Sequence, residues 1–381
     1  MTFAIAIFRG FLNLIYAVFK LFPVRNKITL ISRQSDSASE DFLMLKTELK
    51  KQSPDTEIKI LCKKLRKSPL ALFSYMGHIL VQMYHIATSR TVVLDSYCIP
   101  ISILKQRKKL RVIQIWHAMG ALKKFGLSIR GEEEGSNPKL AKAMRMHRNY
   151  TCVIASGKSC IKPFAEAFGC SEEIIEIASL PRVDRLMSDK QRQSVTDRIL
   201  DKYPELKPAK DCNKEIIVYA PTFRKHRDIS NEIASLVDEI KTEDRILVIK
   251  KHPLMELSMD ESEGVIIDNF FSTEEMLYIA DCVISDYSAI VFEAALLEKH
   301  MCFYAFDLDE YKASRSFYLD YDSEMPGDIC RTAYEVETAL RDSHFDVEAV
   351  RRFARSYVEK TDDVTKDLAG IVLMKNELNT I

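Results

Sequence analysis

The most chemically informative segment of the chain is Asp281–Glu293, which reads Asp-Cys-Val-Ile-Ser-Asp-Tyr-Ser-Ala-Ile-Val-Phe-Glu. Its apolar start predicts a buried strand, and hydroxyl and carboxylate side chains follow where a helix should begin. Ser285, Asp286 and Ser288 can cap that helix, which leaves backbone N–H groups at its positive end free for a phosphate. Taken alone, the segment fits equally a turn that only caps a helix.

Three further segments place a titratable or basic residue directly after a predicted strand. His117 follows a strand near 111–116, Arg224 follows one near 215–220, and the Lys251-His252 pair follows one near 245–250. In open α/β sheets, ligands bind at the carboxyl ends of the strands. The four strand ends together predict a ligand site with anion-binding groups.

These segments, together with 180–184 (Leu-Pro-Arg-Val-Asp) and 304–311, resemble in order the CDP-glycerol glycerophosphotransferases of teichoic-acid and capsule synthesis. The similarity extends over roughly residues 91–327. It implies a GT-B-like α/β fold, in which two doubly wound parallel-sheet domains enclose an interlobe cleft. It also implies transfer of glycerol phosphate from CDP-glycerol to a hydroxyl of a membrane-linked saccharide or polyol-phosphate acceptor, with release of CMP. The sequence after His117 looks like the short, primase-like members.

The resemblance also implies roles for single residues. His117 corresponds to the base that accepts the acceptor hydroxyl proton, and His252 to a second catalytic group that contacts the donor phosphates and can protonate CMP. We expect Asp286 to bind a donor hydroxyl or to orient a histidine. The donor-binding candidates are Thr222, Arg224, Lys251, Ser285, Asp286 and Ser288, and the candidates for the acceptor side or without a firm role are Lys123, Lys124, Arg182 and Glu293.

Several alternatives stay open from the sequence. CDP-ribitol is the close rival of CDP-glycerol as donor, and a GT-B glycosyltransferase of sugar nucleotides or a catalytically silent membrane scaffold would be a different class of protein. The Asp307-Leu308-Asp309 segment superficially resembles a D-x-D metal motif. We expect no metal site there, and no cofactor is firmly implied, although a divalent metal is not excluded.

Composition limits the function classes further. The 381 residues contain 55 basic and 55 acidic side chains, so no overall field would recruit nucleic acid or anionic lipid, and any electrostatic attraction must be local. The nine cysteines lack any C-x-x-C pair, which argues against a disulfide framework or a thiolate zinc site and fits a reducing cytoplasm. The oligomeric state cannot be read from these features.

The alternation of β-branched apolar runs with helical patterns predicts two parallel sheets. We expect an N-terminal acceptor-side domain at 24–190, a helix and linker at 191–213, and a C-terminal donor-binding domain at 214–381. The predicted strands lie near 27–32, 57–62, 91–95, 111–116, 152–156, 215–220, 245–250, 264–268, 281–285 and 301–304.

Residues 1–23 form a predicted amphipathic helix. Arg9, Asn13, Tyr16 and Lys20 recur at helical spacing and give it one polar stripe on an otherwise apolar surface. We expect this helix to lie in the membrane interface and to hold the protein on the cytoplasmic face of the cell membrane. A spanning helix and a helix packed on the domain are the alternatives. A second uncharged stretch, 68–89, is better explained as a core helix than as another membrane contact.

Overall fold

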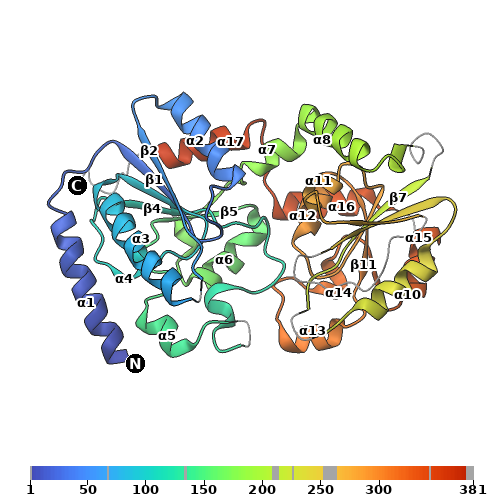
Figure 1. Ribbon diagram of the computed structural model, residues 1–381, viewed down its shortest axis with the longest axis horizontal. Helices are drawn as coiled ribbons and strands as arrows, with labels where there is room; N and C mark the ends of the chain where they lie inside the picture. Colours follow the sequence, from blue (N-terminus) through green and yellow to red (C-terminus); the bar gives the residue numbers. More distant parts are fainter. Residues whose placement is uncertain are drawn as a thin grey trace. The chain divides into compact units, whose positions relative to one another are not determined.

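The computed structural model describes residues 2–66, 68–132, 135–207, 214–224, 227–251, 264–342 and 345–374. The chain divides into two compact units, each built on a parallel sheet of six strands (Figure 1). The first unit takes the described residues of Met1–Met119, Lys124–Asp184 and Glu359–Ile381, and the second takes those of Gly120–Lys123 and Arg185–Val358. This confirms the predicted class of two parallel-sheet α/β domains.

The sheet of the first unit has the strand order β2-β1-β3-β4-β5-β6. All its strand pairs are parallel, and β1, β3, β4 and β5 are buried along their whole length, as expected for strands covered on both faces. Its strands are β1 (Lys27–Ser32), β2 (Glu57–Cys62), β3 (Thr91–Leu94), β4 (Arg111–Gln114), β5 (Cys152–Ala155) and β6 (Ile175–Ile177). The short edge strand β6 was not predicted.

Helices and turns connect these strands. The helices of the first unit are α1 (Thr2–Phe19), α2 (Glu40–Gln52), α3 (Pro69–Thr88), α4 (Ile99–Ile103), η1 (Gly126–Ile129), α5 (Pro138–Ala143), η2 (Lys158–Cys160), α6 (Ile161–Phe168), η3 (Glu172–Ile174) and α17 (Val364–Leu373). The helix α7 (Arg182–Met187) contains the boundary between the two units.

The sheet of the second unit has the order β12-β11-β10-β7-β8-β9, also parallel throughout. Its strands are β7 (Glu215–Ala220), β8 (Arg245–Lys250), β9 (Val265–Asp268), β10 (Cys282–Ser285), β11 (His300–Tyr304) and β12 (Asp328–Cys330). Its helices are α8 (Asp189–Lys202), α10 (Ser230–Ile240), α11 (Thr273–Met276), α12 (Ile290–Leu296), α13 (Leu308–Ser314), α14 (Tyr321–Glu324), α15 (Ala333–Asp342) and α16 (Val347–Tyr357). The edge strand β12 was not predicted.

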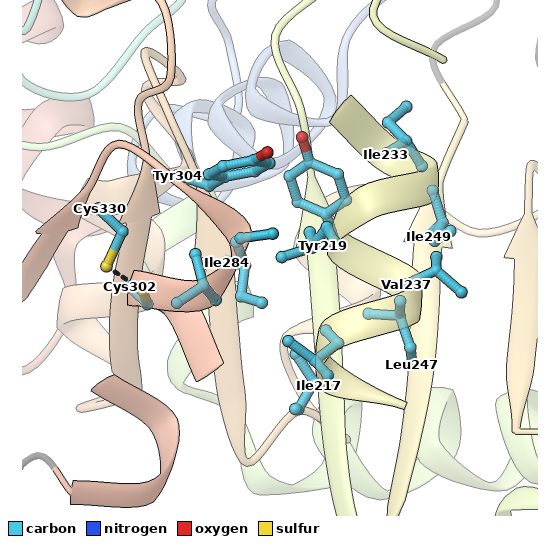
Figure 2. Packing of buried hydrophobic residues seen from close by; sticks show 14 of the residues in the cluster. Ile217, Tyr219, Ile233, Val237, Leu247, Ile249, Ile284, Cys302, Tyr304 and Cys330 are labelled. Carbon is cyan, nitrogen blue, oxygen red and sulfur yellow. Dashed lines mark hydrogen bonds between the residues drawn. The ribbon is translucent and has the colours of Figure 1, made fainter. Parts of the chain in front are cut away.

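The core of the second unit lies between its sheet and the helices α10 and α15. Ile217, Tyr219 and Ile284 of the central strands are fully buried against Ile233 and Val237 of α10 (Figure 2). The opposite half of α10 carries polar residues, which gives the amphipathic pattern of a helix on a sheet face. This rigid layer fixes the ends of β7 and β10.

The unit boundaries differ from the sequence-based division at two places. α8 was expected in a linker but belongs to the second unit, and the segment from Glu359 was assigned to the C-terminal domain but belongs to the first unit. The second difference has a local cause, because the Asp184 carboxylate accepts hydrogen bonds from Val364 N at 3.0 Å and Thr365 N at 2.7 Å. These bonds cap α17, which packs against α2.

The helix α1 is docked on the first unit through its polar stripe. Tyr16 is fully buried and its hydroxyl donates to Gln106 Oε1 at 2.7 Å, while Lys105 N donates to Asn13 Oδ1 at 2.8 Å. The opposite, apolar side of α1 is solvent-exposed, with Leu14 at 67%. None of the helices in the described part of the chain combines the length with the apolar composition that crossing a membrane requires.

The helix α3 departs from a simple core helix. Its Ile79, Met83 and Ile86 are buried, as predicted, but Leu70 and Phe73 near its start are among the most exposed apolar side chains of the protein. α3 packs beside α1 (Figure 1), and Tyr84 of α3 makes edge-to-face contacts with Phe19 and Phe22 at 6.0 and 5.7 Å between ring centroids. Exposed apolar side chains therefore gather on two neighbouring helices.

Candidate active site

In each sheet, strands are first added on one side of the starting strand and later strands on its other side, which defines one topological switch point. In the first sheet this switch point lies between β1 and β3, and in the second it lies between β7 and β10. Crevices at the carboxyl ends of strands at such points are where doubly wound sheets bind ligands. His117 lies at the first switch point, and Thr222 and Ser288 lie at the second. The sequence analysis had singled out all three residues.

His117 is held by residues that follow β1 and β3. Its Nδ1 lies 2.9 Å from the backbone carbonyl oxygen of Asp95 and 3.0 Å from Gln34 Nε2. The carbonyl oxygen of Asp95 only accepts hydrogen bonds, so this contact favours the tautomer with a proton on Nδ1, in which the Gln34 amide has Nε2, 3.5 Å away, as its acceptor. Nε2 then carries the lone pair and is the atom able to accept a proton.

The surroundings of His117 keep its imidazole neutral. Burial is the main cause that lowers its pKa from the usual 6.5, and the nearby Arg182 guanidinium lowers it further against the opposing bond to Asp95. The adjacent Asp95 is buried, which raises its carboxyl pKa to about 6. A neutral imidazole whose Nε2 can accept a proton is the state that a general base requires, and here Gln34 Nε2 lies 3.5 Å from that atom.

The backbone next to His117 is strained. Trp116 has a φ of 58°, a left-handed conformation that is costly for a bulky residue, and its ring stacks on Phe125 at 4.9 Å between centroids. Strain of this kind concentrates at functional sites, where the surrounding packing enforces it. The packing of Trp116 thus determines the direction of the chain at His117.

Arg182 is placed behind this site and is already paired. Its backbone N donates to Asp41 Oδ1 at 2.8 Å, and its Nε and Nη2 donate to Asp41 Oδ2 at 2.9 and 2.5 Å. The guanidinium fork is therefore occupied by a carboxylate at the start of α2, and Arg182 acts on His117 through its charge. Lys124 is half-buried in the first unit and makes no comparable contact with the other described residues.

A cavity of about 520 Å³ lies at the second switch point, entirely within the second unit. This volume is ordinary for a small-molecule site. Three lysines, five hydroxyl or amide side chains and two phenylalanines line it, and none of the lining residues that the structure describes is acidic. The lining residues are Lys123, Ala220, Pro221, Thr222, Phe223, Lys250, Lys251, Asn269, Phe271, Ser272, Thr273, Ser288 and Ala289.

Arg224 does not face this cavity as a free phosphate ligand, which corrects the role expected from the sequence. Its Nε donates to Asp307 at 2.8 Å, its Nη2 donates to Asp286 at 2.9 Å, and its Nη1 donates to the Thr222 carbonyl at 2.7 Å. All three side chains of this ion-pair network are almost completely buried. Burial opposes the charge, but the two carboxylates raise the pKa of Arg224 overall.

Asp286 is likewise structural rather than directed at a donor hydroxyl. It accepts hydrogen bonds from Thr222 N at 2.9 Å, Thr222 Oγ1 at 2.5 Å and Tyr287 N at 2.6 Å. These bonds tie the loop after β7 to the loop after β10. Asp286 therefore fixes the two loops that line the cavity and lies beneath them.

The predicted capping of α12 is wrong, because its N-cap residue is Ala289 and no side chain caps the helix there. Ser288 Oγ accepts from Ile290 N at 3.3 Å, whereas buried Ser285 donates to the Ala220 carbonyl at 2.9 Å and so joins β10 to β7. Glu293 is buried within α12 and does not line the cavity. A capping box formed by Ser272 and Glu275 is present at the start of α11.

Lys123 brings a positive charge into the cavity. Its Nζ donates to the Tyr311 hydroxyl at 3.2 Å, and burial, followed by the nearby Arg315, lowers its pKa from 10.5 to about 8. The sequence analysis left its role open between the acceptor side and none, and the structure places it with the predicted donor-binding residues Thr222, Lys251 and Ser288.

The end of β8 supplies the other two lysines. Lys250 is buried and pairs with Asp268, which also accepts from the Tyr203 hydroxyl at 2.7 Å. Lys251 is half-buried on the cavity wall. The predicted catalytic residue His252 lies outside the described residues.

Comparison with known proteins places the chain. Residues 14–367 match the family model described as CDP-Glycerol:Poly(glycerophosphate) glycerophosphotransferase. The chain belongs to this glycerophosphotransferase family.

Individual relatives are enzymes of teichoic-acid synthesis. The chain is 31% identical to a teichoic acid ribitol-phosphate primase of Bacillus spizizenii over 95% of this chain and 94% of the relative. It is 28% identical to a teichoic acid glycerol-phosphate primase of the same organism, over 81% and 78% of the two chains. The solved structure of the wall teichoic acid polymerase TagF (H444N with CDPG) superposes with a TM-score of 0.70 at 19% identity and covers 97% of both chains, which shows the shared GT-B-like fold.

The sequence patterns of this glycerophosphotransferase did not reveal the side chains that orient His117, Arg182 and Arg224. Gln34, Asp95 and Asp41 support His117 and Arg182, and Asp307 holds Arg224. Asp95 directly follows β3, so the strand-end rule that found His117 could have found it too. Asp41 gives no comparable signal, because its partner is distant in the chain.

The Asp307-Leu308-Asp309 segment can be tested directly. No cluster of three or more His, Cys, Asp or Glu side chains suited to a metal ion occurs in the part of the chain that is described.

Asp307→Asn should lower the free energy of unfolding by on the order of 3 kcal/mol, because it leaves Arg224 short of a buried countercharge. Asp309→Asn is the matched control, since Asp309 is exposed and should change stability little. Urea unfolding measures both; equal losses in both variants would contradict the structural role of Asp307.

Proposed function

We propose that the protein transfers a polyol phosphate from a CDP-activated donor to a hydroxyl of a membrane-linked acceptor and releases CMP. The observation that carries this proposal is the cavity at the second switch point, whose wall combines Lys123 and Lys251 with Thr222 and Ser288 and has no carboxylate among its described residues. Such a wall suits a pyrophosphate, which carries several negative charges and accepts hydrogen bonds.

The chemistry requires one proton acceptor and charge stabilisation. His117 Nε2 takes the proton of the acceptor hydroxyl, and the hydroxyl oxygen attacks the phosphorus that carries the polyol. The bond between this phosphorus and the oxygen bridging the two phosphates breaks, and CMP leaves with that oxygen. Lys123 and Lys251 offset the negative charge that develops on the phosphates.

Glycerol is the polyol implied by the family description, and ribitol is the second candidate. The ribitol alternative is supported by the ribitol-phosphate primase, which matches at 31% identity over 95% of the chain, compared with 28% over 81% for the glycerol-phosphate primase. Both of these relatives are primases, which supports addition of the first unit to an acceptor rather than extension of a long polymer.

The donor and the base are tested together. Purified protein is incubated with CDP-glycerol or CDP-ribitol and a lipid-linked disaccharide, and CMP release and product mass are measured. We expect transfer from one donor, and a loss of about 10²- to 10⁴-fold in kcat for His117→Ala. His300→Ala, in the second unit and away from the cavity, is the control. If neither donor yields product although CDP binds, the proposal of a transferase is wrong; sugar transfer would identify a glycosyltransferase instead.

The pH profile of kcat/KM should have two limbs. His117 must be neutral to act, and its lowered pKa keeps it neutral down to pH values below 6.5, so the acid limb should lie below 6.5. Lys123 must be charged to bind phosphate, so activity should fall as the pH rises through about 8. Lys123→Arg should move the basic limb to higher pH, because an arginine stays protonated.

The neighbouring Lys124→Arg is the matched control and should leave both limbs in place. An unshifted basic limb in Lys123→Arg would exclude Lys123 as the group responsible.

We also propose that α1 and α3 attach the protein to the anionic surface of a bilayer on its cytoplasmic face. α1 turns its polar stripe to the protein and exposes the opposite apolar side. A helix on the surface of a soluble protein usually does the reverse and turns its apolar face to the core. Leu21 after α1 and Phe73 of α3 are each 82% exposed. Exposed Arg25 and Lys105 lie next to α1, where they complement anionic lipid headgroups.

Surface variants test this attachment better than deletion of the first 22 residues, which would uncover the groove that holds Leu12 and Tyr16. Leu14→Ser with Val18→Ser should weaken binding to anionic vesicles by more than about tenfold, because two exposed apolar side chains no longer enter the bilayer. Leu43→Ser, an exposed site on α2, is the control. Vesicle flotation measures binding. Equal binding by the wild-type protein and by the variant with Leu14→Ser and Val18→Ser would contradict the proposed orientation.

A further inference from the structure

The first unit contains a second cavity that the transfer reaction does not use. It has a volume of about 420 Å³ and lies between the segment after η1 and the loop after α5. Arg130, Lys142, Arg145 and Arg148 all line it, and none of its lining residues among those that the structure describes is acidic. Within the described part of the chain, none of the four cations forms an ion pair. Four positive charges around one cavity predict an anionic ligand.

Helix electrostatics account for only part of this cluster. Lys142 and Arg145 lie at the C-terminal end of α5, where cations interact favourably with the helix dipole. Arg130 and Arg148 come from other segments and gain nothing from α5. Their convergence on the same cavity therefore needs a different explanation.

The loop that carries two of the cations is held in a costly conformation. Arg145, His147 and Asn149 have φ values of 49°, 60° and 71°, in the left-handed region that residues other than glycine rarely adopt. The loop is fixed from inside, since Asn149 Nδ2 donates to the Ile101 carbonyl at 2.7 Å and buried His147 Nδ1 lies 2.9 Å from the Tyr150 hydroxyl. His147 is thereby turned inward, while Arg145 and Arg148 remain at the surface.

The cavity lies next to the helix that we propose to be in the membrane interface. Arg9 of α1 donates to the carbonyl of Ala143, the last residue of α5, at 3.3 Å, and Figure 1 shows α5 beside the N-terminal half of α1. Ile7 and Phe11, on either side of Arg9 in the sequence, are exposed. With α1 in the interface, the cavity lies near the level of the lipid headgroups.

We infer that this cavity binds the phosphate group of a membrane lipid. The inference rests on the proposed membrane attachment but not on the transfer reaction, and it assigns the cavity a ligand separate from the CDP donor. Two sources share this chemistry: the polyprenyl phosphate that anchors a lipid-linked acceptor, and the anionic lipids of the bilayer itself. In the first case the site would hold the acceptor by its anchor, and in the second it would orient the protein on the membrane.

The test uses the full chain and three kinds of vesicle: phosphatidylcholine alone, phosphatidylcholine with phosphatidylglycerol, and phosphatidylcholine with a polyprenyl phosphate at the same surface charge. The variant with Arg145→Gln and Arg148→Gln should bind the phosphate-bearing vesicles about tenfold or more weakly than the wild-type protein. Each basic residue near an anionic surface raises the affinity by a factor of roughly five. Lys139→Gln with Lys162→Gln removes the same charge from exposed positions outside the cavity and should change binding less.

A greater loss on polyprenyl phosphate vesicles would identify the acceptor anchor as the source, and equal losses on both would identify bilayer lipids. If the control loses as much as the cavity variant, or if the wild-type protein prefers no phosphate-bearing vesicle, the inference is wrong. Arg130→Gln, outside the strained loop, repeats the test if the double variant does not fold. CMP release is assayed separately, so failure of the transferase proposal is distinguishable from failure of this one.

Discussion

The buried ion-pair network of Arg224, Asp286 and Asp307 is the interaction on which the geometry of the second unit depends. It joins the loop after β7, the loop after β10 and the start of α13 in one set of hydrogen bonds. A buried guanidinium is tolerated only when its donors are paired, and here the paired groups come from three separate segments. Displacement of one loop would leave a buried charge unpaired, so the network opposes movement of the two loops relative to each other.

This arrangement separates structural charges from charges available for binding. Arg224 and Lys250 each pair with carboxylates and are neutralised within the protein. Lys123 and Lys251 line the cavity, and no carboxylate is among the described residues of its wall, so these two charges are available to an anionic ligand. The same separation occurs at the other switch point, where Arg182 is paired with Asp41 and yet influences the protonation of His117.

Local patterns in the sequence predicted most of the fold, and they singled out several residues that the structure places at the two switch points. Strands with continuous apolar runs were found because they are buried on both faces, whereas β6 and β12 are three-residue edge strands with no clear pattern. His117, Thr222 and Ser288 were singled out because they lie two or three residues after the ends of β4, β7 and β10. The role of Arg224 was misjudged because its partner Asp307 is distant in sequence, and only the folded sheet shows that its fork is occupied. Whether a charged residue is already paired depends on contacts between residues that are distant in the sequence.

The strained Trp116 has a practical consequence, because it is the only tryptophan in the chain. The Trp116 indole stacks on Phe125, and the indole centroid lies 4.1 Å from the centroid of the His117 ring. All tryptophan fluorescence of the protein therefore comes from a ring next to the proposed base. Protonated imidazole quenches indole fluorescence more strongly than neutral imidazole does. The native protein thus carries a built-in optical reporter of the charge on His117, which needs no label and no substrate.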